Sequence, residues 1–381
     1  MLVNYIFDYL STLERRTMQS KSGISKTMAV LAIIIIVIGM VATYYILNPK
    51  TTITLNGAGA TFPEPLIKKW ASEYNKMNPS VVINYQGVGS GGGIQQIKEK
   101  VVDFAGTDAP VKDEEMTTGY LVHIPETMGV VVVAYNIPGL TGSLKLDGDT
   151  IAKIFLGNIT KWNDERLVAL NPELSQIDKD IFVAHRSDGS GTTYIFTDYL
   201  SAVSEEWAIK VGKGKSVNWP VGVGAQGNPG VAGLIRQNPY SIGYMEITYA
   251  YLNNISYAWI KNEFSGEFIE PTLESVSKAA EGFLDQMQED VRVSIVNSPN
   301  PEAYPIASFT YILLYKELNV YGEKMNLEKA KALLNFIWWA VHEGQSYSEA
   351  LLYPRLPPEV VVICEELLHS ITYNGEHIIT S

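Results

Sequence analysis

The chain of 381 residues is predicted to be an α/β protein. From residue 51 on, short strand-like runs alternate with amphipathic helical stretches. Three of the strand-to-helix turns are rich in glycine and carry a serine or threonine where the helix begins. This part of the chain is long enough to form two compact lobes.

The first turn joins a strand predicted over 52–55 to an amphipathic helix. The sequence between them, GAGATFPEP, ends its glycine run at Thr61 and Phe62. Pro63 and Pro65 stand where the first turn of a helix tolerates proline. The apolar stripe that predicts the helix consists of Leu66, Ile67, Trp70 and Tyr74.

The second turn lies in VVINYQGVGSGGGIQQIKEK, residues 81–100, and places Ser90 just before a helix. Gly87, Gly89 and Gly92 match the G-x-G-x-x-G pattern of dinucleotide-binding folds. Such folds also need an acidic residue at the end of the second strand, about twenty positions on. Asp108 has that spacing but stands in a Thr-Asp-Ala-Pro turn, so a nucleotide site is not favoured. The residues at helical spacing are Ile94, Ile97 and Val101.

The third turn, HRSDGSGTT, follows a strand predicted over 181–184. Arg186 and Asp188 precede a Gly-Ser-Gly-Thr run that opens a helix. The residues of that run with side-chain hydroxyls or free backbone N–H groups are Ser190, Gly191 and Thr192. The helix itself is indicated by the apolar residues Ile195, Phe196, Tyr199 and Leu200.

Together the three turns favour an anion site. A helix N-terminus carries unpaired N–H donors and a partial positive charge, and serine and threonine add uncharged donors. Arg186 could bind an oxyanion through two hydrogen bonds, with Asp188 holding its guanidinium. Each turn alone has an ordinary explanation, because serine and threonine are common helix N-caps, glycine is common in turns, and Arg186 could form a surface ion pair. If all three converge, they form a cage of donors for a small tetrahedral oxyanion.

Asp108 refines this prediction. A carboxylate beside an anion is repulsive unless the anion carries a proton to donate. Phosphate is protonated near neutral pH and sulfate is not, so Asp108 would favour phosphate and reject sulfate. The alternative reading of Asp108 is a turn residue that caps its own backbone.

Composition excludes several functions. The net charge of −12 argues against a sequence-independent nucleic-acid binder. The single cysteine, Cys364, excludes an intrachain disulfide and a multi-cysteine zinc site, and we expect it to be buried. No metal-ligand spacing links the histidines, so an exported metallophosphatase is not favoured and no cofactor is expected. They are His123, His185, His342, His369 and His377.

The N-terminal part predicts membrane attachment. Residues 28–47 are twenty residues without a charge, which is close to a bilayer span, and Arg15, Arg16, Lys21 and Lys26 precede them. The positive-inside rule puts residues 1–27 in the cytoplasm and the globular part outside. A cleaved signal peptide is the competing interpretation.

Two processing features belong to the same prediction. KSGISKTMAV, residues 21–30, resembles the class III signals of archaeal pilins, which would be cut between Ser22 and Gly23. An exported domain could also be glycosylated at Asn158 and Asn254, which stand in Asn-x-Ser/Thr sequons.

Six blocks, in order along 53–315, resemble the PstS family of extracytoplasmic phosphate-binding proteins of ABC importers. They are TLNGAGATFPEPLIKKWASEY, INYQGVGSGGGIQQI, VDFAGTDAPV, HRSDGSGTTYIFTDYL, VNWPVGVGAQGNPGVAGLIRQNPYSIGYMEITYA and YPIASFTYILLY. The resemblance implies a two-lobed type II periplasmic-binding-protein fold, with two α/β lobes joined by two crossover strands. Lobe I would comprise 51–132 and 306–381, and lobe II 133–305.

The resemblance also implies a function. The chain would capture inorganic phosphate by hinge closure, without catalysis, and pass it to the permease of an ABC transporter, with the receptor domain acting as a monomer. The implied ligand contacts, with Asp188 in support, are Thr61, Phe62, Ser90, Asp108, Arg186, Ser190, Gly191 and Thr192.

Three departures from the family stand out. His185 replaces a frequent arginine, Gly91 replaces a frequent serine, and the apolar segment 28–47 stands where bacterial members have a lipid-attachment cysteine or a cleaved signal. Two other functions remain open: a surface or filament-forming adhesin that uses the fold as a scaffold, and a receptor for another oxyanion such as sulfate or molybdate.

Overall fold

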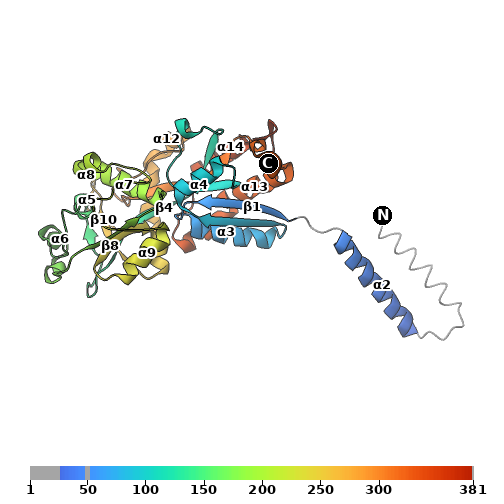
Figure 1. Ribbon diagram of the computed structural model, residues 1–381, viewed down its shortest axis with the longest axis horizontal. Coiled ribbons are helices and arrows are strands. Elements are labelled where there is room, and N and C mark those ends of the chain that lie inside the picture. Colours follow the sequence, from blue (N-terminus) through green and yellow to red (C-terminus); the bar gives the residue numbers. More distant parts are fainter. Residues whose placement is uncertain (1–25, 48–51, 380–381) are drawn as a thin grey trace. The chain divides into compact units, whose positions relative to one another are not determined.

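The computed structural model describes residues 26–47 and 52–379 (Figure 1). The chain divides into two compact units at Thr51 and Thr52, and each is described by itself. In the first unit, the predicted apolar helix is present as α2, Lys26–Leu47. Residues 1–25 of the predicted leader segment, with its cleavage position, lie outside the described residues.

The prediction that 28–47 spans a membrane is not supported. Within 26–47 and 52–379, no helix combines the length and the apolar character that crossing a membrane requires.

The second unit is built on a mixed sheet of nine strands, whose order is β2-β1-β3-β12-β4-β8-β6-β7, with β9 added on β4. The strands are β1 Ile53–Gly59, β2 Val81–Gly87, β3 Phe104–Thr107, β4 Leu121–Asn136, β6 Phe182–Arg186, β7 Val223–Ala225, β8 Ser241–Glu246, β9 Ser256–Tyr257 and β12 Ala307–Tyr315. Two small sheets contain β5 Lys145–Leu146, β10 Trp259–Lys261 and β11 Phe268–Ile269, and β13 Thr372–Tyr373 with β14 Glu376–His377.

Strand β4 is shared by two lobes. Its first part, up to Val130, pairs antiparallel with β12, and its second part, from Val131, pairs antiparallel with β8. In one lobe β1 lies between the parallel strands β2 and β3, and in the other β6 lies between the parallel strands β7 and β8. The carboxyl ends of β1, β3 and β6 are therefore available to carry a site between the lobes.

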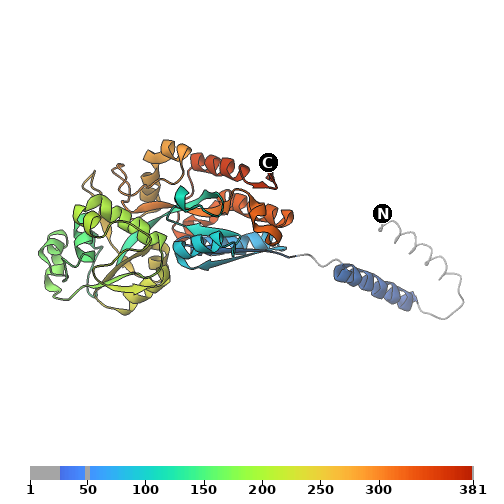
Figure 2. The same cartoon turned by 45° about the horizontal axis from the view of Figure 1, so that its top comes forward.

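Helices cover both parts of this sheet (Figure 2). In one lobe α3 packs on β2, α4 on β1 and β3, and α14 on β4, while in the other α9 packs on β6 and β8. The helices are α3 Glu64–Met77, α4 Gly89–Lys98, α5 Gly148–Phe155, α6 Glu165–Leu170, α7 Gly191–Val203, α8 Glu205–Lys210, α9 Gly227–Gln237, α10 Ile247–Leu252, α11 Leu273–Ala280, α12 Leu284–Glu289, α13 Leu327–Val341 and α14 Pro358–His369.

The three predicted strand–turn–helix units are present, and their apolar stripes are buried in α3, α4 and α7. Val101 is an exception, because α4 ends at Lys98 and the Val101 side chain is 60% exposed. The glycine-rich sequence of α4 has a packing reason. A Cβ on Gly93 would lie only 2.5 Å from the Gly59 Cα in β1, so only glycine allows this close approach.

Candidate oxyanion-binding site

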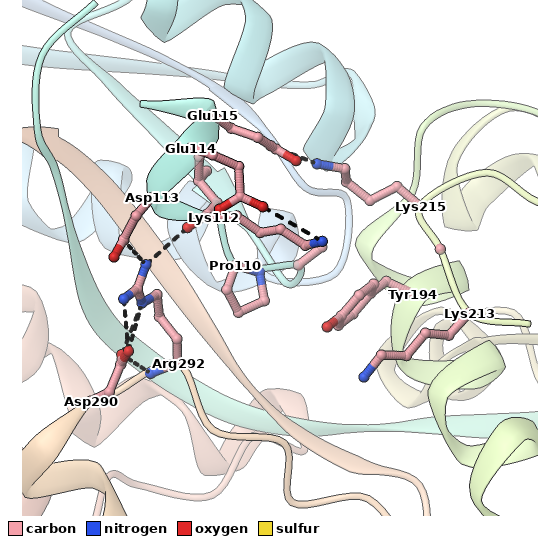
Figure 3. Close-up of a pocket in the computed structure, with 13 residues that line it drawn as sticks. Pro110, Lys112, Asp113, Glu114, Glu115, Tyr194, Lys213, Lys215, Asp290 and Arg292 are labelled. Carbon is pink, nitrogen blue, oxygen red and sulfur yellow. Dashed lines mark hydrogen bonds and ion pairs between the residues drawn. The ribbon is translucent and has the colours of Figure 1, made fainter. Parts of the chain in front are cut away.

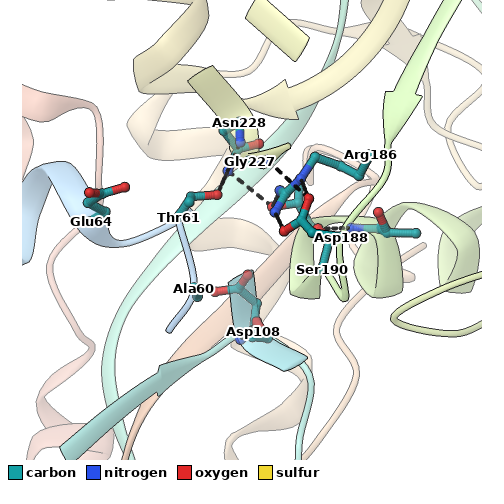
Figure 4. A network of polar contacts seen from close by, with 12 residues as sticks. Ala60, Thr61, Glu64, Asp108, Arg186, Asp188, Ser190, Gly227 and Asn228 are labelled. Carbon is teal, nitrogen blue, oxygen red and sulfur yellow. Dashed lines mark hydrogen bonds and ion pairs between the residues drawn. The ribbon is translucent and has the colours of Figure 1, made fainter. Parts of the chain in front are cut away.

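The structure brings the three predicted glycine turns together between the lobes. Figure 4 shows Thr61 of the first turn, Ser190 of the third turn and Asp108. The three turns follow β1, β2 and β6, and the turn of Asp108 follows β3. Every predicted contact residue is buried, and those with side chains are at most 3% exposed. They are Thr61, Phe62, Ser90, Asp108, Arg186, Ser190, Gly191 and Thr192.

The turn before α3 is held by residues of both lobes. The Thr61 Oγ1 accepts hydrogen bonds from the backbone N–H and the side-chain amide of Asn228, at 3.1 and 3.0 Å. The Thr61 carbonyl accepts from Tyr249 Oη at 2.6 Å, and the Phe62 carbonyl accepts from Tyr353 Oη at 2.7 Å. With both carbonyls turned to these tyrosines, the backbone of this turn is fixed in direction.

The turn before α4 contacts the third turn directly. The Gly91 N–H donates to the Gly189 carbonyl at 2.7 Å, so the two helix N-termini meet across the lobes. The Cβ of a serine at position 91 would lie 3.1 Å from the Gly189 Cα and carbonyl oxygen. Glycine at this departure from the family pattern therefore suits the close approach seen here.

Arg186, the last residue of β6, is fixed by Asp188. Its Nε and Nη2 donate to the two carboxylate oxygens at 2.7 and 2.5 Å, and its Nη1 donates to Thr192 Oγ1 at 3.3 Å. Burial raises the pKa of Asp188, but the hydrogen bonds and charge of Arg186 outweigh it and keep that pKa below its usual value. The guanidinium is thus held in one orientation. The ring of the neighbouring His185 stacks on Trp219, and its Nδ1 lies 3.0 Å from the Arg186 carbonyl oxygen.

The N-terminus of α7 presents donors to the same place. Ser190 is the N-cap, and its Oγ accepts from the Thr193 N–H at 3.0 Å, which leaves the hydroxyl hydrogen available. The first N–H groups of the helix, at Gly191 and Thr192, have no partner within the helix. A Cβ added to Gly191 would overlap Asp108 Oδ2 and Ser90 Oγ, so these groups face one another closely.

The carboxylate that faces the N-terminus of α7 is that of Asp108. Its N–H donates to Ser90 Oγ at 3.2 Å, and its Oδ1 accepts from Thr310 Oγ1 at 2.8 Å. Burial raises the pKa of Asp108 to about 7, although Thr310, the charge of Arg186 and Ser90 act in the opposite direction. Near neutral pH the ligand-free site therefore contains both the neutral and the ionised form of Asp108, and the ionised form can accept a hydrogen bond from a protonated anion.

Asn228, near the start of α9, was not among the site residues predicted from the sequence. Besides its two bonds to Thr61, its Nδ2 donates to Thr192 Oγ1 at 3.2 Å, and its Oδ1 accepts from the Glu246 N–H at 3.2 Å. It therefore links a turn of each lobe. The signal was a fourth glycine turn before a helix, in AQGNPG, but an asparagine there is also an ordinary turn residue. Thr310 was missed as well, because nothing local marks it.

A surface cavity of about 490 Å³ lies beside the site (Figure 3). A smaller cavity of about 130 Å³ shares Tyr194 and Arg292 with it and is also lined by Asp108. Two contacts between the lobes involve residues that line the larger cavity: Arg292 Nη1 donates to Asp113 Oδ1 at 2.5 Å, and Lys215 Nζ lies 3.7 Å from Glu115 Oε2.

The arrangement is suited to binding a small anion. Hydroxyls, helix N–H groups and one guanidinium converge, and the Asp108 carboxylate lies among them as an acceptor. Among residues 26–47 and 52–379, no cluster of three histidine, cysteine or acidic side chains could hold a metal ion. Cys364 is buried as predicted, and its thiol donates to the Pro125 carbonyl.

Comparison with known proteins finds a matching domain family and relatives that extend over most of the chain. Residues 48–343 match the PBP superfamily domain. The phosphate-binding protein PstS of Haemophilus influenzae is 43% identical over 325 residues, which cover 84% of this chain and 95% of that protein. The PstS of Pasteurella multocida is 43% identical over 309 residues, covering 81% and 88%.

The solved structure of a high-affinity periplasmic phosphate-binding protein, PfluDING, bound with phosphate, has a TM-score of 0.63. At 20% identity, over 82% of this chain and 93% of the other, that likeness concerns the two-lobed fold. The alignments with the two PstS proteins have much higher identity and extend over most of both chains. On that ground the chain belongs to the PstS family of the PBP superfamily.

Proposed function

We propose that this protein captures inorganic phosphate between its two lobes and delivers it to an ABC transporter permease. It is a binding protein and not an enzyme. The observation that carries the proposal is Asp108, a buried carboxylate set among donors from three helix N-termini and Arg186. Such a site favours an oxyanion that keeps a proton, which phosphate does and sulfate does not. The names of the PstS relatives support the same ligand.

The proposed contacts follow from this geometry. The N–H of Phe62 and the N–H groups of Gly191 and Thr192 would donate to phosphate oxygens, together with the hydroxyls of Thr61, Ser90, Ser190 and Thr192. Arg186 would donate through its guanidinium while Asp188 holds it. Binding at micromolar strength requires about 8 kcal/mol, which a set of charge-assisted hydrogen bonds can supply.

Lobe closure would couple binding to delivery. We assign 52–132 and 306–381 to one lobe and 133–305 to the other, because β4 changes partners between Val130 and Val131, close to the first of these boundaries. The bonds from Asn228 to Thr61, and from Gly91 to Gly189, exist only when the lobes are together. Separating the lobes would break them and open the site, and the closed form would dock on the permease.

Location is a further part of the proposal. We place the binding domain outside the cytoplasm, where an importer collects its substrate. Attachment through residues 28–47 stays a prediction from the uncharged sequence alone. It is tested by expressing the full-length chain and a chain that starts at Thr52. Carbonate-resistant sedimentation of only the full-length chain with membranes would support attachment, and equal release of both would contradict it.

Calorimetry tests the ligand. Purified full-length chain, freed of bound anion by unfolding and refolding, is titrated with phosphate and then sulfate at about pH 7.5. One-to-one saturation by phosphate with a much weaker sulfate response supports the proposal. A folded protein that prefers sulfate or molybdate contradicts it, and ligand-independent assembly without phosphate binding would favour an adhesin. Light scattering on the same samples also tests the expected monomer.

A further inference from the structure

A second buried carboxylate lies behind Asp108. Glu126 on β4 is fully buried, and it is the extra residue of a β-bulge, since Thr310 and Tyr311 of β12 pair with Thr127 and Pro125. The bulge leaves Glu126 without a paired residue, and such irregularities redirect a side chain. The Gln345 side chain donates to the Glu126 carbonyl at 3.0 Å and so supports the bulge.

The Thr310 hydroxyl lies between the two carboxylates. Its Oγ1 is 2.8 Å from Asp108 Oδ1 and 3.4 Å from Glu126 Oε1. It has one hydrogen, which goes to Asp108 by the shorter distance, and it can accept a hydrogen bond from a second group. The Thr107 carbonyl, at 3.4 Å, is its alternative acceptor.

Glu126 is in surroundings that favour its neutral form. Among the described residues it forms no ion pair, and its Oε2 has no hydrogen-bond partner. Burial first, and the charge of Asp108 second, raise the pKa of Glu126 well above its usual value, while Thr310 opposes them weakly. Asp108, with better hydrogen bonds and the charge of Arg186, is the member of the pair that loses its proton first.

We infer that Glu126 is a positioning residue of the phosphate site: as a neutral acid it donates to Thr310 Oγ1, which commits the Thr310 hydrogen to Asp108 Oδ1. Asp108 Oδ2, on the side of Gly191 and Ser90, is then left as the acceptor for the proton of the bound anion. This relay rests on the proposed function, because it explains how Asp108 is kept in the form that selects a protonated oxyanion.

The proposed hydrogen-bond relay from Glu126 through Thr310 to Asp108 predicts that phosphate binding weakens above a certain pH. Ionised Glu126 would place a second negative charge near the bound anion and compete for the Thr310 hydrogen, so phosphate affinity should fall at alkaline pH. The titratable groups around Glu126 are Asp108 beyond Thr310, Tyr85 from β2, and Cys364, whose thiol contacts the neighbouring Pro125. Phosphate keeps at least one proton through this range, and its change from the singly to the doubly charged form near neutral pH affects every variant alike. A fall that the Glu126 variants lack would therefore come from the protein.

The experiment compares phosphate affinity from about pH 7 to about pH 9.5 for the purified full-length chain and two variants. In Glu126→Gln the amide still donates to Thr310, so affinity near pH 7 should stay within about threefold and the alkaline fall should disappear. In Glu126→Met the donor is lost and Thr310 can turn to Thr107. Affinity near pH 7 should then drop by about threefold to tenfold, again without the alkaline fall.

Glu246 supplies the matched control. It is also a buried acid, burial raises its pKa to about 8, and it contacts Thr248 rather than Thr310. Glu246→Gln should keep the alkaline fall of the unchanged chain. If the fall survives in both Glu126 variants, or is lost only in Glu246→Gln, the inference is overturned. Equal affinity of the Gln and Met variants near pH 7 would overturn the positioning role.

Infrared spectroscopy separates this inference from the proposed function. The difference spectrum between the unchanged chain and Glu126→Gln near pH 7, without ligand, should contain the C=O band of one protonated carboxyl. Its absence overturns the inference even if phosphate binds normally. If phosphate does not bind at all, the proposed function fails and so does the role of Glu126 in phosphate binding, whatever the band shows.

Discussion

At the scale of single residues, the environment of Asp108 decides what the site can accept. A buried carboxylate costs free energy unless its oxygens find donors. Here Thr310 satisfies Oδ1, and Oδ2 faces the N-terminus of α7. An anion that brings its own proton completes this set, whereas a fully ionised anion leaves Asp108 facing a like charge.

Replacing this carboxylate by its amide should therefore weaken the choice between anions. In Asp108→Asn the amide can donate to either anion, so the ratio of phosphate to sulfate affinity should fall about tenfold to a hundredfold. Calorimetric titration of the full-length variant with both anions measures the ratio. Asp103→Asn is the control, because Asp103 is buried at the other end of β3 and pairs with Lys329. An unchanged ratio in Asp108→Asn would remove the role given to this residue.

The same residue should make the ligand-free protein less stable at higher pH. The folded-state pKa of Asp108 is raised from 3.8 to about 7, so the folded state holds this proton more tightly than the unfolded state does. The stability that protonated Asp108 contributes is fully present below about pH 4 and is lost as pH rises through about 7.

Urea unfolding at about pH 5 and about pH 8 measures this effect. Asp108→Asn lacks the titration, so its stability relative to the unchanged protein should increase with pH, by at most about 4 kcal/mol. A constant difference between the two proteins would mean that the carboxyl titrates normally.

At the scale of elements, α7 turns a helix terminus into a binding surface. The Ser190 N-cap closes the first turn, and the N–H groups of Gly191 and Thr192 remain for a ligand. Glycine at 191 is required by its neighbours, since a Cβ there would enter the space of Asp108 and Ser90. The helix can approach the opposite lobe only because this position has no side chain.

Gly191→Ala should accordingly reduce phosphate affinity at least about a hundredfold, because the methyl group separates the donors from Asp108. Gly233→Ala is the matched control: Gly233 lies within α9, and a Cβ there meets nothing within 4 Å. That variant should bind normally and gain about 0.5–1 kcal/mol in stability. Near-normal phosphate binding by a folded Gly191→Ala protein would contradict the close packing described here.

At the scale of the whole molecule, the closed arrangement depends on a few contacts between lobes. Asn228 is central because it binds Thr61 of one lobe and Thr192 of its own. The exposed pairs at the cavity, such as Lys215 with Glu115, contribute less, since surface ion pairs are worth about 0–1 kcal/mol.

Asn228→Ala should therefore weaken phosphate binding about tenfold, mainly through faster release, because the closed state loses buried hydrogen bonds. Stopped-flow release of phosphate measures the rate. Asn238→Ala, at the other end of α9, removes a bond to the Leu234 carbonyl within one lobe and is the control. Equal release rates in both variants would show that Asn228 does not hold the lobes together.

Local patterns predicted much of this architecture. Apolar spacing located α3 and α7, and glycine followed by a hydroxyl marked the helix N-termini. The errors were also local: Val101 has helical spacing but follows the end of α4, and β1 continues through the glycines to Gly59 although the predicted strand stopped at residue 55. Strand pairing with β2 and β3 over those glycines extends β1, and no short pattern contains that information.

By itself, the sequence determined the α/β class, the turns that carry donors and the residues with the right chemistry, because capping, periodicity and charge act within a few positions. Only the tertiary structure decided which of these groups face one another. The link from Asn228 to Thr61, the place of Thr310 and the bulge that redirects Glu126 all depend on strands distant in the chain. Burial, which sets the protonation of Asp108 and Glu126, likewise arises only when segments distant in the chain pack around them.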